Sequence, residues 1–353
     1  MANLLSAWRV PPAQRLVSID SIVYKSGCLS RRAVRSRTKR KGHQEMKTAY
    51  IARLDYKGWP NCCRLTNGLV DLIVTTDVGP RIIRFGFVDD CNELKEYEKM
   101  LGKTGGTEWR IYGGHRLWHA PEREPRTYVP DNSPIQLEQR SGFARLIQPV
   151  EPTTGIQKEI DIRLAPDAPH VDLIHRLRNL NAWAVEFAPW ALTVLPPGGQ
   201  AIVPLPPRGR HSENLSPVNS LTMWAYTDMT DPRWTWGRKY IMLRQDSNAN
   251  TSQKFGAMVT AGWAAYARDG HLFVKHFHHA FGATYPDLGC SLEVFTNNDM
   301  LELGTLGPLS TVQPNGMIEH IERWFLFRDV PTPRNEEAVD EVILPQVRTA
   351  IVS

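Results

Sequence analysis

The sequence predicts an all-β fold, a single large sandwich of sheets over roughly residues 47–331. Short strand-like segments follow one another along this region, and turn residues separate them, with 25 Gly and 26 Pro among the 353 residues. Only one segment has a helical pattern, which favours a sandwich or a barrel over a mixed fold. The hydrophobic content of 42% suffices for a large core and excludes a chain that is disordered throughout.

Residues 1–46 are predicted to be a disordered basic tail or an incorrectly assigned start, with Met46 as the true first residue. Residues 1–45 carry ten Lys or Arg and two Asp or Glu, whereas the rest of the chain is slightly acidic. The net charge of +5 therefore belongs to the tail, so we expect no nucleic-acid partner for the folded region. Because no apolar run is long enough for a membrane helix and no signal peptide is evident, we expect a cytoplasmic protein without membrane contact.

The first strands are predicted from an early hairpin. In the run CCRLTNGLVDLIV, the Asn-Gly pair at 67–68 accepts the positive φ angles of a tight turn between two strand-like segments. The Val-Gly-Pro turn at 78–80 then leads into the apolar segment RIIRFGF. Cys62 and Cys63 are predicted to lie on opposite faces of a strand, since the five cysteines show neither a disulfide framework nor zinc-ligand spacing. A reducing compartment follows from this.

The later part of the folded region shows further strands and one helix. Apolar residues alternate with polar ones over 160–164, as one buried face requires, and another such run starts at Val171. Near the C-terminus the run NEEAVDEVI predicts a short helix that Asn335 caps and Pro345 ends, within a tail over 332–353. A lone helix on a body of strands supports the all-β prediction.

The densest group of polar and aromatic side chains lies in the run YGGHRLWHAPE, residues 112–122, which we interpret as a loop. Two glycines allow a turn at its start, and a proline stiffens its exit. Five of its side chains suit acid–base chemistry, charge pairing or stacking, namely His115, Arg116, Trp118, His119 and Glu122. This indicates a functional site, and a loop packed over a sheet edge is the alternative.

Tryptophan in polar surroundings is a second indication of function. Ten of the eleven tryptophans follow Met46, and Trp234 lies in a run with Asp231 and Arg233. An aromatic ring packs against the C–H face of a pyranose, while charged neighbours bind its hydroxyl groups. The combination favours a sugar ligand.

The run KHFHH is a third candidate. Strand alternation places His276 and His278 on one face, with Lys275 and His279 on the other, and the histidine spacing suits a divalent metal. A metal-dependent, cupin-like enzyme is therefore an alternative function. It requires His276, His278 and His320 to converge on one point.

Glu302 is a fourth candidate, in the run MLELGTLGPL. It lies between two leucines, and if these face the core of a strand, Glu302 faces the opposite side, into solvent or a cleft. A carboxylate in a partly desolvated cleft has a raised pKa and can act as a general base.

Taken in order, four segments resemble the galactose mutarotase-like superfamily, which includes aldose 1-epimerases and hexose-6-phosphate mutarotases. They are NGLVDLIVTTDVGPRIIRFGF, YGGHRLWHAPE, NLNAWAVEFAPWALTVLPPGG and LELGTLGPLSTVQPNGMIEHIERWFLF. More closely, the chain resembles a DUF4380-type branch related to them. The resemblance implies a β-supersandwich in which a Glu takes the proton from the anomeric hydroxyl and a His protonates the ring oxygen, with neither metal nor organic cofactor.

The resemblance places Glu302 at the position of the base and Trp190 where the acid histidine is expected. Two interpretations stay open, because His115, His119 or His276 could take the acid role, or the cleft could bind a sugar without the reaction. We predict pyranose binding first and aldose 1-epimerase activity second, with a noncatalytic glycan-binding protein and the metal enzyme as alternatives. The predicted catalytic residues are Glu302, His119 and His115, and the predicted substrate-binding residues are Arg116, Trp118, Glu122, Trp190, Asp231, Arg233, Trp234 and His276.

Overall fold

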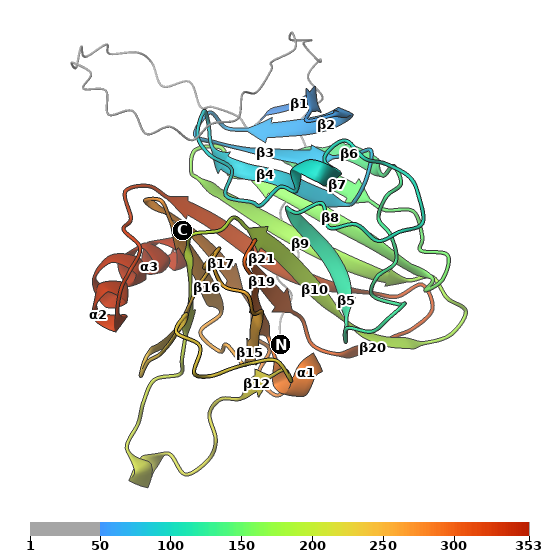
Figure 1. Ribbon diagram of the computed structural model, residues 1–353. Coiled ribbons are helices and arrows are strands. Elements are labelled where there is room, and N and C mark those ends of the chain that lie inside the picture. Colours follow the sequence, from blue (N-terminus) through green and yellow to red (C-terminus); the bar gives the residue numbers. More distant parts are fainter. Residues whose placement is uncertain (1–49, 353) are drawn as a thin grey trace, which may run out of the picture.

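The protein folds into two large antiparallel sheets packed face to face, which confirms the predicted all-β class. The computed structural model describes residues 50–352, and the predicted basic tail lies outside the described residues. One sheet has eleven strands and the other ten. Figure 1 shows the chain passing repeatedly between the sheets, with β1–β4 stacked at one end.

The eleven-stranded sheet carries the candidate site. Its path runs β1 (Tyr50–Tyr56), β2 (Trp59–Thr66), β3 (Val70–Thr75), β4 (Arg81–Phe87), β5 (His115–Ala120), β10 (Val185–Leu195), β19 (Leu301–Leu306), β18 (Leu292–Thr296), β15 (Gln253–Ala257) and β12 (Leu221–Met223), and β20 (Ser310–Val312) also pairs with β10.

The ten-stranded sheet covers the inner face of the first. Its path runs β13 (Trp234–Trp236), β14 (Tyr240–Arg244), β11 (Gln200–Pro204), β16 (Trp263–Arg268), β17 (His271–Phe277), β21 (Met317–Phe327), β9 (His170–Asn179), β8 (Ile156–Leu164), β7 (Phe143–Ile147) and β6 (Gln136–Arg140).

The predicted early strands are present in the expected register. Strands β2 and β3 form the hairpin, with Gly68 at φ 82°, a left-handed conformation that glycine adopts without steric cost. Cys62 and Cys63 belong to different buried clusters on the two faces of β2, which confirms their predicted alternation. The alternating apolar residues of 160–164 lie in β8 and face the core.

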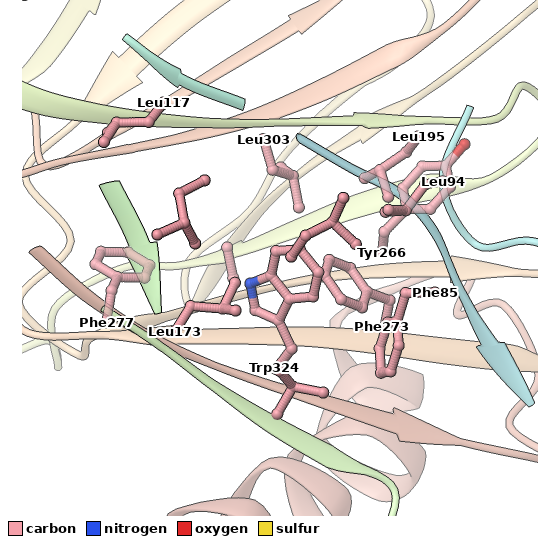
Figure 2. Close-up of a cluster of buried hydrophobic side chains, with 14 of the residues drawn as sticks. Phe85, Leu94, Leu117, Leu173, Leu195, Tyr266, Phe273, Phe277, Leu303 and Trp324 are labelled. Atoms are coloured by element: carbon pink, nitrogen blue, oxygen red, sulfur yellow. The ribbon is translucent and has the colours of Figure 1, made fainter. Parts of the chain in front are cut away.

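The main core fills the space between the sheets, and Trp324 lies near its middle. Its indole is fully buried and contacts Phe85 of the eleven-stranded sheet and Phe273 of the ten-stranded sheet, with ring centroids 5.7 and 5.4 Å away. Figure 2 shows these rings together with leucines from both sheets. Smaller apolar clusters lie on the outer faces of both sheets.

The C-terminal helix is longer than the sequence predicts. Asn335 caps it by accepting from the Ala338 N–H, as expected, but the helical segment continues through α2 (Glu336–Ala338), a π-helical turn η3 (Val339–Ile343) and α3 (Leu344–Val352). The prediction that Pro345 ends the helix is therefore wrong. The Leu344 N–H bonds to the Val339 carbonyl, and this wider turn accommodates the proline that follows it.

The helix packs on the outer face of the ten-stranded sheet. Its buried residues Val339, Ile343 and Val347 contact a cluster that includes Trp263 and Phe325, and Figure 1 shows α2 and α3 beside β16 and β17. The remaining helical turns are short: α1 (Pro286–Gly289), η1 (Glu98–Met100) and η2 (His211–Glu213). Within residues 50–352 no helix combines the length and the apolar character that crossing a membrane requires.

Candidate active site

The segment predicted as a functional loop is in fact a strand, and this divides its side chains between two faces. Residues His115–Ala120 form β5, which pairs with β4 and β10. Because side chains alternate along a strand, Arg116 and Trp118 face outward, whereas His115 and His119 face the inside of the sandwich. The interpretation as a loop is therefore wrong, and its five side chains do not form one site.

Glu302 lies on the outward face of the same sheet, as its position between two leucines predicts. Leu301 and Leu303 are fully buried in the core, and the Glu302 side chain points away from them with 12% of its surface exposed. The Nη2 of Arg116 donates to Oε2 of Glu302 at 3.1 Å. Two predicted site residues that are 186 positions apart thus meet on one face.

Five neighbouring strands build this surface, which we call the Glu302 face. They are β5, β10, β19, β18 and β15, and their register places the outward residues in rows across the sheet. The outward side chains include Arg116 and Trp118 (β5), Trp190 (β10), Glu302 (β19), Glu293 and Phe295 (β18) and Lys254 (β15). Glu122, just after β5, lies 3.6 Å from the Lys254 ammonium and joins the same surface.

Aromatic rings form the floor of the Glu302 face. Trp118 and Trp190 are directly opposite one another on β5 and β10, with centroids 5.6 Å apart. The partly exposed rings of Trp109 and Tyr128 pack against Trp118, at 5.7 and 5.0 Å. Gly304 makes this floor possible, because a Cβ there would come within 2.7 Å of the Trp190 indole nitrogen.

Cationic groups lie over these rings. The Arg116 guanidinium is 4.4 Å from the Trp118 ring centre, and the Lys254 ammonium is 5.2 Å from that of Trp190 and 4.1 Å from that of Trp224. Within residues 50–352, Nε and Nη1 of Arg116 and Nε1 of Trp190 are buried N–H groups without a hydrogen-bond partner. These donors suit a polar ligand, since buried polar groups are normally paired.

Lys254 and Glu293 are functional candidates that sequence reasoning missed. The Lys254 ammonium lies 2.8 Å from Oε2 of Glu293, and both side chains are almost fully buried. Burial raises the pKa of the Glu293 carboxyl to about 8, although the Lys254 ammonium acts in the opposite direction. Glu293 lies between Leu292 and Val294, the same pattern that identifies Glu302, so that pattern could have found it.

The inward-facing His115 belongs to a polar network between the sheets. Its Nδ1 is 2.9 Å from the Thr193 hydroxyl, and its Nε2 is 2.7 Å from Nε2 of His175. Burial holds the pKa of His115 well below its usual range, so the ring is neutral. One ligand atom from each of His115, His175 and Glu322 lies within 4.8 Å of the others. Lys275, however, holds that carboxylate at 2.7 Å, so the group forms an internal ion pair and suits no metal.

His119 is also part of an internal ion-pair cluster. Its Nε2 lies 3.5 Å from Oε2 of Glu151, which in turn pairs with Lys158 at 2.5 Å. His119 and Glu151 are essentially fully buried, and burial lowers the pKa of the His119 imidazole. The structure thus places both predicted catalytic histidines of β5 on the opposite side of the sheet from Glu302.

The predicted residues Asp231, Arg233 and Trp234 lie together but away from the Glu302 face. Arg233 binds both carboxylate oxygens of Asp231, at 2.9 and 2.8 Å. Trp234 packs on the inward-facing Phe255, at 5.4 Å, and its Nε1 donates to a backbone carbonyl. Phe255 and Lys254 point to opposite faces of β15, so Trp234 belongs to the core.

His276 lies on the outer face of the other sheet. Together with His278, His279 and Arg323 it lines a cavity of about 550 Å³. His320 faces inward from β21 and contacts Thr305 between the sheets. The structure therefore does not bring His276, His278 and His320 together, as the metal-enzyme alternative requires.

Comparison with known proteins identifies the fold. The chain matches no protein-family model and no curated protein. A galactose mutarotase-like protein from Lactobacillus casei aligns with a TM-score of 0.52 and 7% identity, over 76% of this chain and 100% of that one. A candidate aldose 1-epimerase from Klebsiella pneumoniae aligns with a TM-score of 0.52 and 10% identity, over 85% and 87% of the two chains.

A third similar structure is part of a larger protein. The TPR-domain-containing protein from Parabacteroides distasonis aligns with a TM-score of 0.51 and 14% identity, over 77% of this chain and 48% of its own. At these identities the likeness concerns the fold. The protein has the galactose mutarotase-like β-sandwich fold, and the resemblance inferred from its four segments is confirmed at that level.

Proposed function

We propose that this protein binds a pyranose on the Glu302 face. The observation that carries the proposal is the Glu302–Arg116 pair beside an aromatic floor on one outward sheet face. The partly exposed rings of Trp109, Tyr128 and Phe295 offer apolar plates for the C–H groups of a sugar. Glu302, Arg116 and Lys254 supply charged hydrogen-bonding groups for its hydroxyls or for an anionic substituent.

The names of two structures with the same fold agree with this proposal, since they refer to galactose mutarotase and aldose 1-epimerase. Of the predicted site residues, the binding residues Arg116, Trp118, Glu122 and Trp190 share this face with the catalytic candidate Glu302. The proposal therefore rests on these, together with Lys254.

Glu302→Gln is expected to weaken sugar binding about 10- to 100-fold, because a hydrogen bond to a charged group contributes about 1.5–3 kcal/mol. The variant keeps the shape of the side chain and removes its charge. Isothermal titration calorimetry is the measurement, after a thermal-shift screen of monosaccharides and sugar phosphates has identified the ligand. A ligand at 100 times its Kd adds about 2.7 kcal/mol of stability, which such a screen detects.

Glu319→Gln is the matched control. Glu319 also pairs with an arginine, Arg176, at 2.6 Å, but it lies on β21 of the other sheet. We expect this variant to bind the sugar as the wild type does. An equal loss of affinity in both variants, or a wild-type protein that responds to no sugar or sugar phosphate, would contradict the proposal.

A second candidate function is anomer interconversion by the same face, and the position of Glu293 favours it. Glu293 is opposite Gly304, and Phe295 is opposite Glu302, so the two glutamates are diagonal neighbours on adjacent strands. The Cα atoms of such neighbours are typically about 7–8 Å apart. With a pKa of about 8, the Glu293 carboxyl keeps its proton at neutral pH. It would replace the missing acid histidine, because His115, His119 and His276 lie elsewhere.

In this reaction Glu302 takes the proton from the anomeric hydroxyl while Glu293 gives its proton to the ring oxygen. The bond between C1 and the ring oxygen breaks, and an open-chain aldehyde forms. After rotation at C1, the ring closes by the reverse proton transfers, so both carboxyls return to their initial states. No net proton, electron or cofactor is consumed.

We expect the catalysed rate to fall as the pH rises through about 8, since Glu293 then loses its proton. Anomer interconversion measured by NMR or polarimetry over pH 6–10 tests this, with buffer alone as the reference. Glu302→Gln and Glu293→Gln should both return the rate to that of buffer, whereas Glu319→Gln should not. A wild-type rate equal to buffer, with sugar binding intact, would leave a binding protein and eliminate the isomerase.

A further inference from the structure

A thiol, a carboxylate and an imidazole meet where the two sheets approach each other at one end of the sandwich. Cys91 and Glu93 follow strand β4 of the eleven-stranded sheet, and His271 is the first residue of β17 in the ten-stranded sheet. Phe87 packs against the His271 ring, with centroids 5.3 Å apart. Two side chains with metal-binding atoms, from one short segment, thus meet a third that lies 180 residues after Cys91 in the sequence.

The three atoms form a compact triangle. Sγ of Cys91 lies 3.6 Å from Oε1 of Glu93 and 3.8 Å from Nδ1 of His271, and the last two atoms are 2.5 Å apart. The Cys91 thiol donates to Oε1 of Glu93, and the same oxygen is the hydrogen-bond partner of the His271 ring nitrogen, so the three potential ligand atoms converge on one point.

These distances are close to those of a tetrahedral zinc site. With Zn–S of about 2.3 Å and Zn–N and Zn–O of about 2.0–2.2 Å, the ligand atoms lie about 3.3–3.6 Å from one another. The two distances to sulfur already agree within about 0.3 Å, and only the Glu93–His271 separation must widen. The set of one S, one N and one O donor suits zinc better than the oxygen-preferring Mg²⁺ or Ca²⁺.

The surrounding side chains orient these ligands. Arg268 contacts the other carboxylate oxygen of Glu93 at 3.6 Å, so Oε1 is the oxygen directed at the site. Asp90 lies 3.7 Å from Nε2 of His271, the arrangement in which a carboxylate fixes the ring of a metal-binding histidine. Arg328 in turn pairs with Asp90 at 3.3 Å.

Exchange of two protons for a zinc ion leaves the local charge unchanged. The carboxylates of Asp90, Glu93 and Asp269 balance Arg268, Arg328 and the protonated imidazole of His271, whose pKa is raised to about 10 by its hydrogen bonds to Cys91 and Glu93, and Zn²⁺ would replace the imidazole and thiol protons. Glu93 is almost fully buried, whereas Cys91 and His271 are partly exposed. The site therefore combines a buried carboxylate with two ligands that are partly accessible to solvent.

We propose that Cys91, Glu93 and His271 bind a zinc ion that links the two sheets, with Asp90 positioning the imidazole. This site lies in a different part of the fold from the Glu302 face and is independent of the proposed sugar binding. Since metal binding requires a deprotonated thiol and a free ring nitrogen, it releases protons.

The test uses the full chain, stripped with a chelator and then dialysed against ZnCl₂. Elemental analysis should find one tightly held zinc per chain, and the melting temperature should rise on zinc addition but not on MgCl₂ addition. Cys91→Ser and His271→Gln should each reduce zinc affinity at least tenfold. With CoCl₂ as a probe, the wild-type protein should show thiolate-to-cobalt charge-transfer absorption, which does not depend on any variant folding correctly.

Two control variants test whether Cys or His side chains elsewhere in the chain bind the zinc. Cys28→Ser combined with His43→Gln removes donors outside the described residues, and His211→Gln removes an exposed histidine elsewhere. Both controls should retain the zinc and the cobalt absorption. A wild-type protein that retains no zinc, or retention that survives Cys91→Ser and His271→Gln or is lost in the controls, would overturn the proposal.

Discussion

Replacing Lys275 by methionine is expected to destabilise the folded protein by about 3–5 kcal/mol at neutral pH. Lys275 is fully buried, and its ammonium lies 2.7 Å from Oε1 of the equally buried Glu322. It also donates to the Thr193 hydroxyl and to the backbone carbonyl of Leu303. Methionine fills a similar volume, so the loss reflects the uncompensated carboxylate that remains between the sheets. Urea unfolding followed by circular dichroism measures it.

The pH dependence of this loss follows from Glu322. Burial by itself raises the pKa of the Glu322 carboxyl, but the Lys275 ammonium and three neighbouring histidines together outweigh burial and hold that pKa below its ordinary value. Because the folded-state pKa of Glu322 is lower than its unfolded-state pKa of about 4.3, the ionised carboxylate stabilises the folded protein at pH values above about 4.3. This stabilisation is lost as the pH falls below that value. The difference between wild type and Lys275→Met should therefore be largest near pH 7 and shrink below about pH 4.

Two comparisons make this prediction specific. Lys239→Met removes an exposed ion pair with Asp340, in which 61% of the lysine side chain is accessible, and should cost far less stability than Lys275→Met, because solvent screens an exposed pair. Combining Lys275→Met with Glu322→Gln removes both charges and should recover part of the stability. Equal losses for Lys275→Met and Lys239→Met, or a loss that does not change with pH, would show that the buried pair does not have this role.

Trp324→Ala is expected to cost about 3–5 kcal/mol, because it removes a fully buried indole from the middle of the core. The variant also removes the 2.8 Å hydrogen bond from the indole Nε1 to Glu322. Figure 2 shows that the ring contacts side chains from both sheets, so the surrounding residues cannot close the cavity without moving the sheets. Urea or thermal unfolding measures the change in free energy.

Two further variants serve as controls. Trp183→Ala tests whether the loss of stability depends on the buried position of the indole, and Trp324→Phe tests whether it depends on the size of the ring. Trp183 is 66% exposed, and its replacement should change the stability by no more than about 0.5 kcal/mol. Trp324→Phe keeps most of the apolar surface and should lose about 1–3 kcal/mol, chiefly from the unpaired Glu322 oxygen. If Trp324→Ala were as mild as Trp183→Ala, the indole would not organise the core.

The position of Glu302 could be predicted from the sequence, whereas its partners could be predicted only in part. The flanking leucines are enough to place Glu302 on the outward face, because alternation is a local property of a strand. Its pairing with Arg116 depends on β10, which lies between β5 and β19. The diagonal relation of Glu293 to Glu302 depends on the register of β18 against β19.

The error at residues 115–120 has the same origin. Two glycines before the segment and a proline after it indicate a loop, but β4 and β10 provide backbone partners on both sides and make it a strand. Alternation then sends His115 and His119 inward, away from Glu302. Local turn signals do not reveal whether a neighbouring strand is available.

The sequence by itself therefore determined the all-β class, the early hairpin, the cap at Asn335 and the outward direction of Glu302, since each depends on residues within a few positions of one another. The tertiary structure alone decided which side chains meet. The Glu302–Arg116 pair, the Lys254–Glu293 pair and the Cys91–His271 contact join residues 39 to 186 positions apart. Long-range strand order sets these contacts, and a pattern with a period of two residues carries no information about it.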